Sequence, residues 1–187
     1  MINAEKKLLR VKYKKLRSDI NNRVLLDELI TDSVLNSYEY KNADRIFAYW
    51  SVDSEVSTHK IINQALTDSK MVALPKCTDN SGNMQFYYID SLSDLSVGMY
   101  GISEPTDKHI ADDFTNVSLC LVPAISFDAQ GYRLGYGKGY YDRFLSKFTG
   151  ISMGLCYSVC ISTELPKDEY DQKVDFIVSD KKIFYNR

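Results

Sequence analysis

The chain has 187 residues, a length that suits one compact domain with a sizeable core. Hydrophobic residues make up 44% and charged residues 26%, which is ordinary globular usage, and the net charge of −2 gives no reason to expect a general nucleic-acid binder. The four cysteines form no close Cys-x-x-Cys pair and there are only two histidines, so a structural zinc site is not expected.

The first predicted element is an amphipathic helix over Glu5–Ile20. Its apolar stripe has spacings of three and four residues and consists of Leu9, Tyr13, Leu16 and Ile20. Lys6 and Arg10 are four residues apart, so they share one face of the helix and can converge on one anion. The simplest interpretation of the remaining positive charges is a solvated surface made of Lys12, Lys14, Lys15 and Arg17.

Apolar runs rich in β-forming residues alternate with helical patterns along the rest of the chain. The predicted strands are Ile46–Trp50, Met71–Leu74, Met84–Ile89, Leu119–Phe127, Ile151–Tyr157 and Val174–Val178. The further predicted helices are Arg23–Tyr38, Thr58–Leu66 and Tyr140–Phe148. This alternation predicts an α/β fold, in which residues 1–187 form a single layered domain with a mainly parallel sheet flanked by helices.

Two segments between these elements have a more specific interpretation. Asp79–Asn83 has the composition of a turn, so Met84–Ile89 is predicted to form a local hairpin with the strand before it. Asp90–Asn116 is the longest irregular stretch, and we interpret it as a binding loop rather than a domain boundary.

The sequence carries no sign of a membrane protein. No apolar run approaches the length of a membrane span, and the basic N-terminal segment lacks the apolar centre of a signal peptide. We therefore expect a cytoplasmic protein with reduced thiols and no membrane partner.

The stretch from Phe127 to Leu145, FDAQGYRLGYGKGYYDRFL, is the strongest functional signal in the chain. A strand that ends in a glycine-rich turn and opens a helix often holds phosphate, because glycines let backbone amides approach the oxygens. Arg133 and Lys138 add positive charge, and Asp142 can hold a divalent metal. The Walker A and dinucleotide motifs fit poorly, since no Ser or Thr follows Lys138 and the last three glycines alternate with other residues. The alternative is a tight turn in which the glycines serve only geometry.

The residues RLGYGKGYYDR resemble the signature of the 5-formyltetrahydrofolate cyclo-ligase family, also called methenyltetrahydrofolate synthetases. This segment is long and has few free positions, which makes it specific. The similarity continues in the family's order through KKLLR at Lys6–Arg10, YWSVDSEVST at Tyr49–Thr58, LPK at Leu74–Lys76, YGISEP at Tyr100–Pro105 and KVDFIVSD at Lys173–Asp180. One departure is Trp50, which stands where an aliphatic residue can occur in the family.

The resemblance implies an enzyme that uses ATP and magnesium to close 5-formyltetrahydrofolate into 5,10-methenyltetrahydrofolate, with release of ADP and phosphate. ATP would convert the formyl oxygen, a poor leaving group, into a phosphate ester that nitrogen-10 then displaces. Such a reaction needs no protein nucleophile, so catalysis would come from positioning and charge stabilisation. The expected partners are these two substrates and not nucleic acid, and we expect a monomer.

The resemblance also carries roles to matching positions. The catalytic residues would be Lys138 and Arg133. ATP would contact Lys6, Arg10, Arg133, Leu134, Gly135, Tyr136, Gly137, Lys138, Gly139, Tyr140 and Tyr141. The folate substrate would contact Trp50, Glu55 and Tyr140, with Lys76 and Glu104 as weaker candidates at the rim. Magnesium would be held by Asp142 and Asp175.

Each of these residues also has a plain structural interpretation. Asp142 and Glu55 would suit the first turn of a helix, Asp175 could simply end a strand, and Trp50 could be core packing. Three other functions stay open as alternatives: a folate or nucleotide binder without turnover, a sugar-phosphate isomerase, and a nucleic-acid binder using the basic helix. The isomerase would need an acid–base pair that we cannot identify, and the near-neutral charge weighs against nucleic acid.

Overall fold

The computed structural model describes residues 2–78, 83–98, 101–106 and 109–185. Within these residues the helices are α1 (Ile2–Ser18), α2 (Arg23–Asn36), α3 (Tyr38–Asn42), α4 (His59–Thr67) and α5 (Tyr140–Leu145), with 3-10 turns at η1 (Leu92–Asp94) and η3 (Ser158–Cys160). The main sheet contains β1 (Arg45–Phe47), β2 (Met71–Cys77), β3 (Met84–Ile89), β6 (His109–Ile110), β7 (Leu119–Val122), β10 (Ile151–Leu155), β12 (Phe176–Val178) and β13 (Ile183–Tyr185). The smaller sheets contain β4 (Leu95–Val97) with β5 (Ser103–Pro105), and β8 (Ser126–Asp128) with β9 (Arg133–Leu134) and β11 (Ile161–Ser162).

The main sheet has the order β13-β12-β10-β7-β1-β2-β3-β6. Its five central strands, β12, β10, β7, β1 and β2, run parallel to one another, whereas β13, β3 and β6 pair antiparallel at the two sides. The predicted α/β fold with a mainly parallel sheet is therefore confirmed. The predicted hairpin is also confirmed, since β2 pairs antiparallel with β3, although part of its turn lies outside the described residues.

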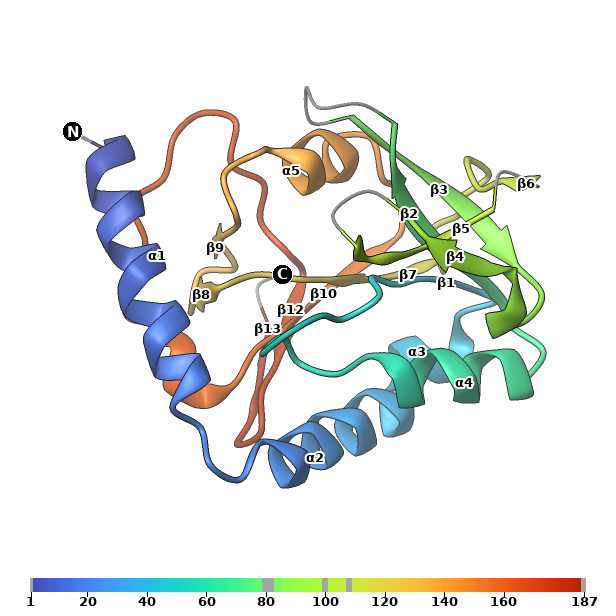
Figure 1. Ribbon diagram of the computed structural model, residues 1–187, viewed down its shortest axis with the longest axis horizontal. Coiled ribbons are helices and arrows are strands. Elements are labelled where there is room, and N and C mark those ends of the chain that lie inside the picture. Colours follow the sequence, from blue (N-terminus) through green and yellow to red (C-terminus); the bar gives the residue numbers. More distant parts are fainter. Residues whose placement is uncertain (1, 79–82, 99–100, 107–108, 186–187) are drawn as a thin grey trace.

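Helices cover both faces of the main sheet. Figure 1 shows α2, α3 and α4 grouped on one face, α5 on the other, and α1 beside β8 and β9. Neighbouring residues of β1 point to opposite faces, since Ile46 packs with the α2 and α4 side and Phe47 packs with Phe144 of the α5 side. A strand buried on both faces needs a continuous apolar run, which explains the sequence pattern of the central strands.

One predicted strand is interrupted. The run Leu119–Phe127 forms β7 in the main sheet and then β8 in the three-stranded sheet. Pro123 follows β7 directly and has no N–H to donate to a neighbouring strand, so the ladder ends there. The break turns the chain away from the main sheet into the β8–β9 hairpin, and this hairpin delivers the glycine-rich loop.

Other predicted elements are present with shifted ends. The first helix begins earlier than expected and ends at Ser18, and α5 is shorter than its pattern suggested. The stretch predicted as an irregular loop contains η1 and the short strands β4, β5 and β6. Across the described residues, no helix combines the length and the apolar character needed to cross a lipid bilayer.

Candidate active site

A cavity of about 990 Å³ lies where parallel strands of the main sheet end. Tyr49 follows β1, Pro75 and Cys77 end β2, and Pro123 follows β7, and all four line this cavity. Ligands in open α/β sheets bind beyond the carboxyl ends of strands, so this is the expected location of a site. The volume is at the upper end for small-molecule pockets, which leaves room for more than one substrate of ordinary size.

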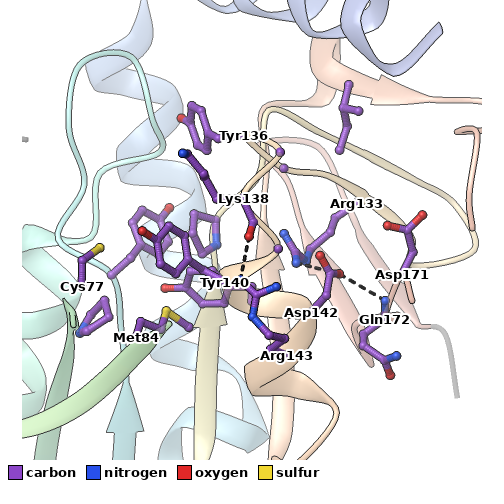
Figure 2. A pocket seen from close by; sticks show the side chains of 18 of the residues that line it. Cys77, Met84, Arg133, Tyr136, Lys138, Tyr140, Asp142, Arg143, Asp171 and Gln172 are labelled. Atoms are coloured by element: carbon purple, nitrogen blue, oxygen red, sulfur yellow. Dashed lines mark hydrogen bonds and ion pairs between the residues drawn. The ribbon is translucent and has the colours of Figure 1, made fainter. Parts of the chain in front are cut away.

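The cavity has two chemically different sides. Met84 and Cys77, with Pro75 and Ile102, form an apolar wall. Figure 2 shows Met84 and Cys77 on one side of Tyr140, and Arg133, Asp142 and Asp171 on the other. The cavity can therefore hold an apolar ring system at one end and a highly charged group at the other.

The glycine-rich loop lines the cavity and begins directly after β9. Gly137 and Gly139 have φ angles of 98° and 70°, a left-handed conformation that favours glycine. A Cβ on Gly135 would lie 2.8 Å from Arg133 Nη1, so a larger residue here would displace the end of that side chain. Gly139 is also the residue before α5, whose first turn carries Tyr140 and Asp142 into the cavity wall.

Arg133 and Asp142 form an ion pair inside the charged side. Arg133 is 8% exposed, and its Nη2 lies 2.8 Å from Asp142 Oδ1. The same carboxylate oxygen accepts a hydrogen bond from the backbone N–H of Gln172, at 3.3 Å. Arg133 Nε is buried and has no acceptor among the described residues.

Lys6 and Arg10 both reach the cavity from α1, as their spacing predicted. Lys6 is only 6% exposed, and its Nζ lies 2.6 Å from Asp171 and 3.0 Å from Asp168. Burial would lower the pKa of Lys6, but the hydrogen bonds and charges of these two carboxylates outweigh it and raise the pKa. Arg10 Nε donates to the carbonyl of Gly135 at 2.8 Å, so it already holds the glycine loop.

Glu55 lies on the wall formed by the loop after β1, outside any helix. Its Oε1 accepts a hydrogen bond from the hydroxyl of Tyr136 at 2.6 Å, and its Oε2 accepts one from the backbone N–H of Val52 at 3.1 Å. Burial raises the pKa of Glu55, and the hydrogen bond from Tyr136 opposes this shift. The interpretation of Glu55 as a charge on the first turn of a helix is therefore wrong, because α4 begins only at His59.

Trp50 lines the cavity and stacks on His59 of α4, with ring centroids 4.2 Å apart. It is half-buried, so one part of the ring packs on the protein and another part is open to the cavity. Lys138 is exposed on the glycine loop and also lines the cavity. Tyr141 lies behind the loop, where burial raises the pKa of its phenol, and its hydroxyl has no hydrogen-bond partner among the described residues.

Asp175 is the predicted site residue that the structure does not bring to the cavity. It directly precedes β12, at the amino ends of the parallel strands, whereas the cavity lies at their carboxyl ends. Its Oδ2 accepts hydrogen bonds from the backbone N–H and the hydroxyl of Ser152, both at 2.9 Å. This geometry corrects the idea that Asp175 and Asp142 form a two-carboxylate metal site. Among the described residues, no group of three or more His, Cys, Asp or Glu side chains is arranged to hold a metal ion.

Of the two weaker candidates for the rim, Glu104 lines the cavity and Lys76 does not.

Several cavity residues were not predicted from the sequence, among them Arg143, Asp168 and Asp171. Arg143 is on α5 and its Nη2 donates to the carbonyl of Lys138 at 2.7 Å, so it bridges the helix back to the loop. Asp168 and Asp171 belong to a segment that reads as ordinary polar surface in the sequence. Only Arg143 had a usable signal, because it is four residues from Gly139 and so lies one helical turn above the loop.

Arg17 was predicted to lie at the surface, and this prediction was wrong. It is 5% exposed and its guanidinium makes three hydrogen bonds to other parts of the chain. Lys6, Arg10, Tyr13 and Arg17 follow one another at spacings of four, three and four, which is the spacing of a single helix face. That spacing could have separated Arg17 from the exposed lysines.

Comparison with known proteins places this geometry in a family. A family model described as the 5-formyltetrahydrofolate cyclo-ligase family matches residues 2–180. The chain belongs to this family. The family resemblance of the glycine-rich loop and its flanking segments is thereby confirmed over nearly the whole sequence.

Individual cyclo-ligases agree with the family match. The chain is 29% identical to a probable 5-formyltetrahydrofolate cyclo-ligase of Schizosaccharomyces pombe, over 94% of this chain and 98% of that protein. It is 28% identical to the 5-formyltetrahydrofolate cyclo-ligase of Mus musculus, over 95% of this chain and 94% of that protein. The solved structure of Aquifex aeolicus 5,10-methenyltetrahydrofolate synthetase is 31% identical, covers 97% of this chain and 93% of its own, and superposes with a TM-score of 0.85. The chain is therefore an enzyme of the ligase class with the fold of a cyclo-ligase.

Proposed function

We propose that this protein converts 5-formyltetrahydrofolate into 5,10-methenyltetrahydrofolate, using ATP and Mg²⁺ and releasing ADP and phosphate. The observation that supports the proposal most directly is the two-sided cavity, which matches a reaction between a flat ring system and a triphosphate. Membership of the cyclo-ligase family supports the choice of these substrates.

The apolar side of the cavity is proposed to hold the pterin. Trp50 offers an aromatic face, and Tyr140 lies between this side and the charged side. Glu55 offers carboxylate oxygens that can accept hydrogen bonds from the amino and ring N–H groups of a pterin. This arrangement would direct the formyl group of the substrate toward the glycine loop.

The charged side is proposed to hold the triphosphate. Arg10, Arg133 and Lys138 supply positive charge, and the backbone of the glycine loop supplies N–H groups. ATP transfers its terminal phosphoryl group to the formyl oxygen, nitrogen-10 attacks the activated carbon, and phosphate leaves as the ring closes. Arg133 and Lys138 would stabilise the charge that develops on the transferred phosphoryl group and on the leaving phosphate.

The role of Lys6 in binding ATP depends on a change in its present contacts. Its charge is already balanced by Asp168 and Asp171. A triphosphate oxygen would have to compete with both carboxylates for the same ammonium group. We therefore propose that Lys6 binds ATP together with a rearrangement of this ion pair, whereas Arg10 needs none.

The residues present fit a magnesium ion held through one carboxylate. Asp142 is a carboxylate on the charged side of the cavity, whereas Asp168 and Asp171 on that side are engaged by Lys6. Magnesium commonly uses one or two carboxylates together with phosphate oxygens and water. Bound magnesium would neutralise part of the charge of the triphosphate. Asp142 would then exchange its contact with Arg133 for the ion, which leaves the guanidinium of Arg133 available to phosphate.

The decisive test mixes purified protein, 5-formyltetrahydrofolate and Mg-ATP, and follows the absorbance of methenyltetrahydrofolate together with ADP. Equal amounts of both products are expected, and none without magnesium. A folate- or nucleotide-binding protein without turnover is the alternative, and it would show binding of one ligand with no ADP. ATP consumption without the folate product would contradict the proposal.

We also propose that the enzyme acts as a cytoplasmic monomer of one domain without nucleic-acid or membrane partners. Light scattering on the same preparation measures the mass of the particle and so tests whether it is a monomer.

A further inference from the structure

Arg17 makes an unusual set of contacts for a residue on the basic helix. Its Nε donates to the hydroxyl of Ser54 at 3.0 Å, its Nη1 to the carbonyl of Ala124 at 3.1 Å, and its Nη2 to the hydroxyl of Tyr136 at 3.0 Å. These three partners lie in the loop after β1, in the turn before β8 and in the glycine loop. One guanidinium therefore joins three segments that surround the cavity, although Arg17 itself does not line it.

The contact with Tyr136 decides how this hydroxyl behaves. A guanidinium can only donate hydrogen bonds, so the Tyr136 oxygen must accept from Arg17. The phenolic proton is then directed to Glu55 Oε1, 2.6 Å away. Arg17 thus fixes both the position and the donor direction of the hydroxyl, and it keeps Glu55 in the role of acceptor.

Glu55 is consequently held at both oxygens. Tyr136 binds Oε1 and the backbone N–H of Val52 binds Oε2, which sets the plane of the carboxylate. Each oxygen keeps a further lone pair that can accept from a ligand. Two parallel N–H groups of a pterin need two acceptor oxygens held in one plane, and this is the geometry that the contacts preserve.

The exposure of Tyr136 separates this arrangement from ordinary core packing. Tyr136 is 48% exposed, so its ring contributes little to the core, yet its hydroxyl lies between two buried or half-buried charged groups. The ring of Tyr136 also contacts α1, because Lys14 Nζ lies 5.2 Å from the ring centroid. A hydroxyl held this firmly on an exposed loop residue suggests a role in the site rather than in stability.

We propose that Arg17 is a positioning residue for the folate substrate, acting through the Tyr136 hydroxyl to hold the Glu55 carboxylate in the plane that receives the pterin. The proposal rests on the proposed function of the cavity. It assigns a role to a residue that contacts neither substrate, and it couples α1 to the folate side as well as to the ATP side.

The test compares Arg17→Gln and Tyr136→Phe, singly and together, with Lys15→Gln as a matched control. Lys15 is exposed on the same helix, so its substitution removes the same charge without these contacts. Trp50 is the only tryptophan in the chain and lines the cavity, so its fluorescence reports folate binding directly. Calorimetry gives the dissociation constant for ATP, and thermal denaturation gives the stability of each variant.

Each single variant is expected to raise the dissociation constant for 5-formyltetrahydrofolate about tenfold, the scale of one hydrogen bond to a charged group. The double variant should be about as weak as either single variant, because both changes break one chain of contacts. The dissociation constant for ATP should change by less than about threefold in Arg17→Gln, because Arg17 does not line the cavity and the phosphates are held by other groups. Arg17→Lys, which keeps the charge and one donor, should recover part of the affinity.

Three results would overturn the inference. Arg17→Gln could lower the melting temperature and leave folate affinity equal to that of Lys15→Gln, which would make Arg17 purely structural. The effects of Arg17→Gln and Tyr136→Phe could add fully, which would mean that they act separately. If Arg17→Gln does not fold, the test rests on Tyr136→Phe alone, because this change removes only one hydroxyl from an exposed residue. Unchanged folate affinity in Tyr136→Phe would then refute the coupling. Wild-type protein that neither binds nor converts the folate would instead show that the proposed function is wrong, and the inference would fall with it.

Discussion

The charges in the cavity are paired before any ligand arrives. Arg133 pairs with Asp142, and Lys6 pairs with two aspartates. Glu55 is linked to Arg17 through the hydroxyl of Tyr136. Paired charges keep a partly buried site stable, because an isolated buried charge is costly. Lys138 differs from these groups because it lies exposed on a loop of glycines, where it can move to a phosphate with little steric hindrance.

Lys138→Ala is expected to lower kcat by roughly two orders of magnitude, the scale seen when one donor that stabilises the transition state is removed. Its stability should stay near that of the wild type, because the exposed side chain contributes little to the core. Lys147→Ala is the control, since Lys147 is exposed just after α5 and does not line the cavity. Steady-state kinetics and thermal denaturation of both variants test this, and activity of Lys138→Ala equal to the control would remove Lys138 from the mechanism.

Folate binding is expected to depend on the ionisation of Glu55. Burial raises the pKa of this carboxyl, although Tyr136, Val52 N–H and Arg17 oppose the shift and Asp53 adds to it. Because the ionised form accepts the pterin N–H groups, affinity is full above this raised pKa and falls as the pH drops through it. The fall should therefore begin at a higher pH than for an ordinary glutamate, whose pKa is about 4.3.

Fluorescence titrations of Trp50 with the folate substrate at a series of pH values measure this dependence. Glu55→Gln is the control, because it binds more weakly at neutral pH but has no carboxyl to titrate at this position. Titration of groups on the folate itself appears in both proteins and cancels in the comparison. A midpoint at or below that of an ordinary glutamate would contradict the expectation.

At the scale of elements, α1 contributes an active-site wall as well as a surface layer. Arg10→Ala should weaken ATP binding by roughly 1.5–3 kcal/mol if Arg10 contacts phosphate, whereas Lys15→Ala should have a much smaller, screened effect. Lys15 is a better control than Lys14, because Lys14 also contacts the ring of Tyr136. Calorimetry at moderate salt compares the two variants, with circular dichroism to confirm the helix. Equal losses would mean that only the diffuse field of the basic helix acts on ATP.

The glycine loop offers a second test at this scale. Gly137→Ala places a Cβ at a φ of 98° and 3.2 Å from Arg10 Nη2, so both the loop and the arginine must shift. Gly131→Ala imposes a similar strain at a φ of 92°, away from the cavity. Both variants should lose stability on the order of 1–2 kcal/mol from the left-handed backbone. Only Gly137→Ala should also lose ATP affinity, and a similar loss in Gly131→Ala would assign the effect to general strain.

The elements were largely predictable from the sequence, and the reasons for the misses are physical. Continuous apolar runs predicted the central strands. The spacing of Lys6 and Arg10 predicted one shared helix face, the family resemblance predicted that this face belongs to the site, and both residues line the cavity. On the same helix, Arg17 was wrongly predicted to lie at the surface. A positive charge in the sequence says little about which partners the fold brings to it. The break after β7 had a local signal in Pro123, which lacks an N–H, whereas the pairing of Lys6 with Asp168 depends on tertiary contacts that no local pattern encodes. Asp175 was assigned to the site from the family signature alone. In the structure it directly precedes β12 and lies away from the cavity.

At the scale of the whole molecule, the two sides of the cavity should stabilise the fold independently. A ligand at 100 times its dissociation constant adds about 2.7 kcal/mol to the free energy of unfolding. Glu55→Gln should lose most of the increase in melting temperature that the folate gives, yet keep the increase given by Mg-ATP. Differential scanning fluorimetry with an external dye measures both increases. Loss of the two together would show that the sides are not separate.

The site is assembled from opposite ends of the chain. Lys6 and Asp171 are 165 residues apart, and Arg10 meets Gly135 across 125 residues. At about 10 residues per second, a ribosome would finish α1 roughly 15 s before it reaches Asp171. For most of that interval Lys6 lacks both of the carboxylates that it contacts in the folded protein. The charged side of the cavity is therefore completed last in synthesis, because Asp168 and Asp171 follow every folate-side residue in the chain.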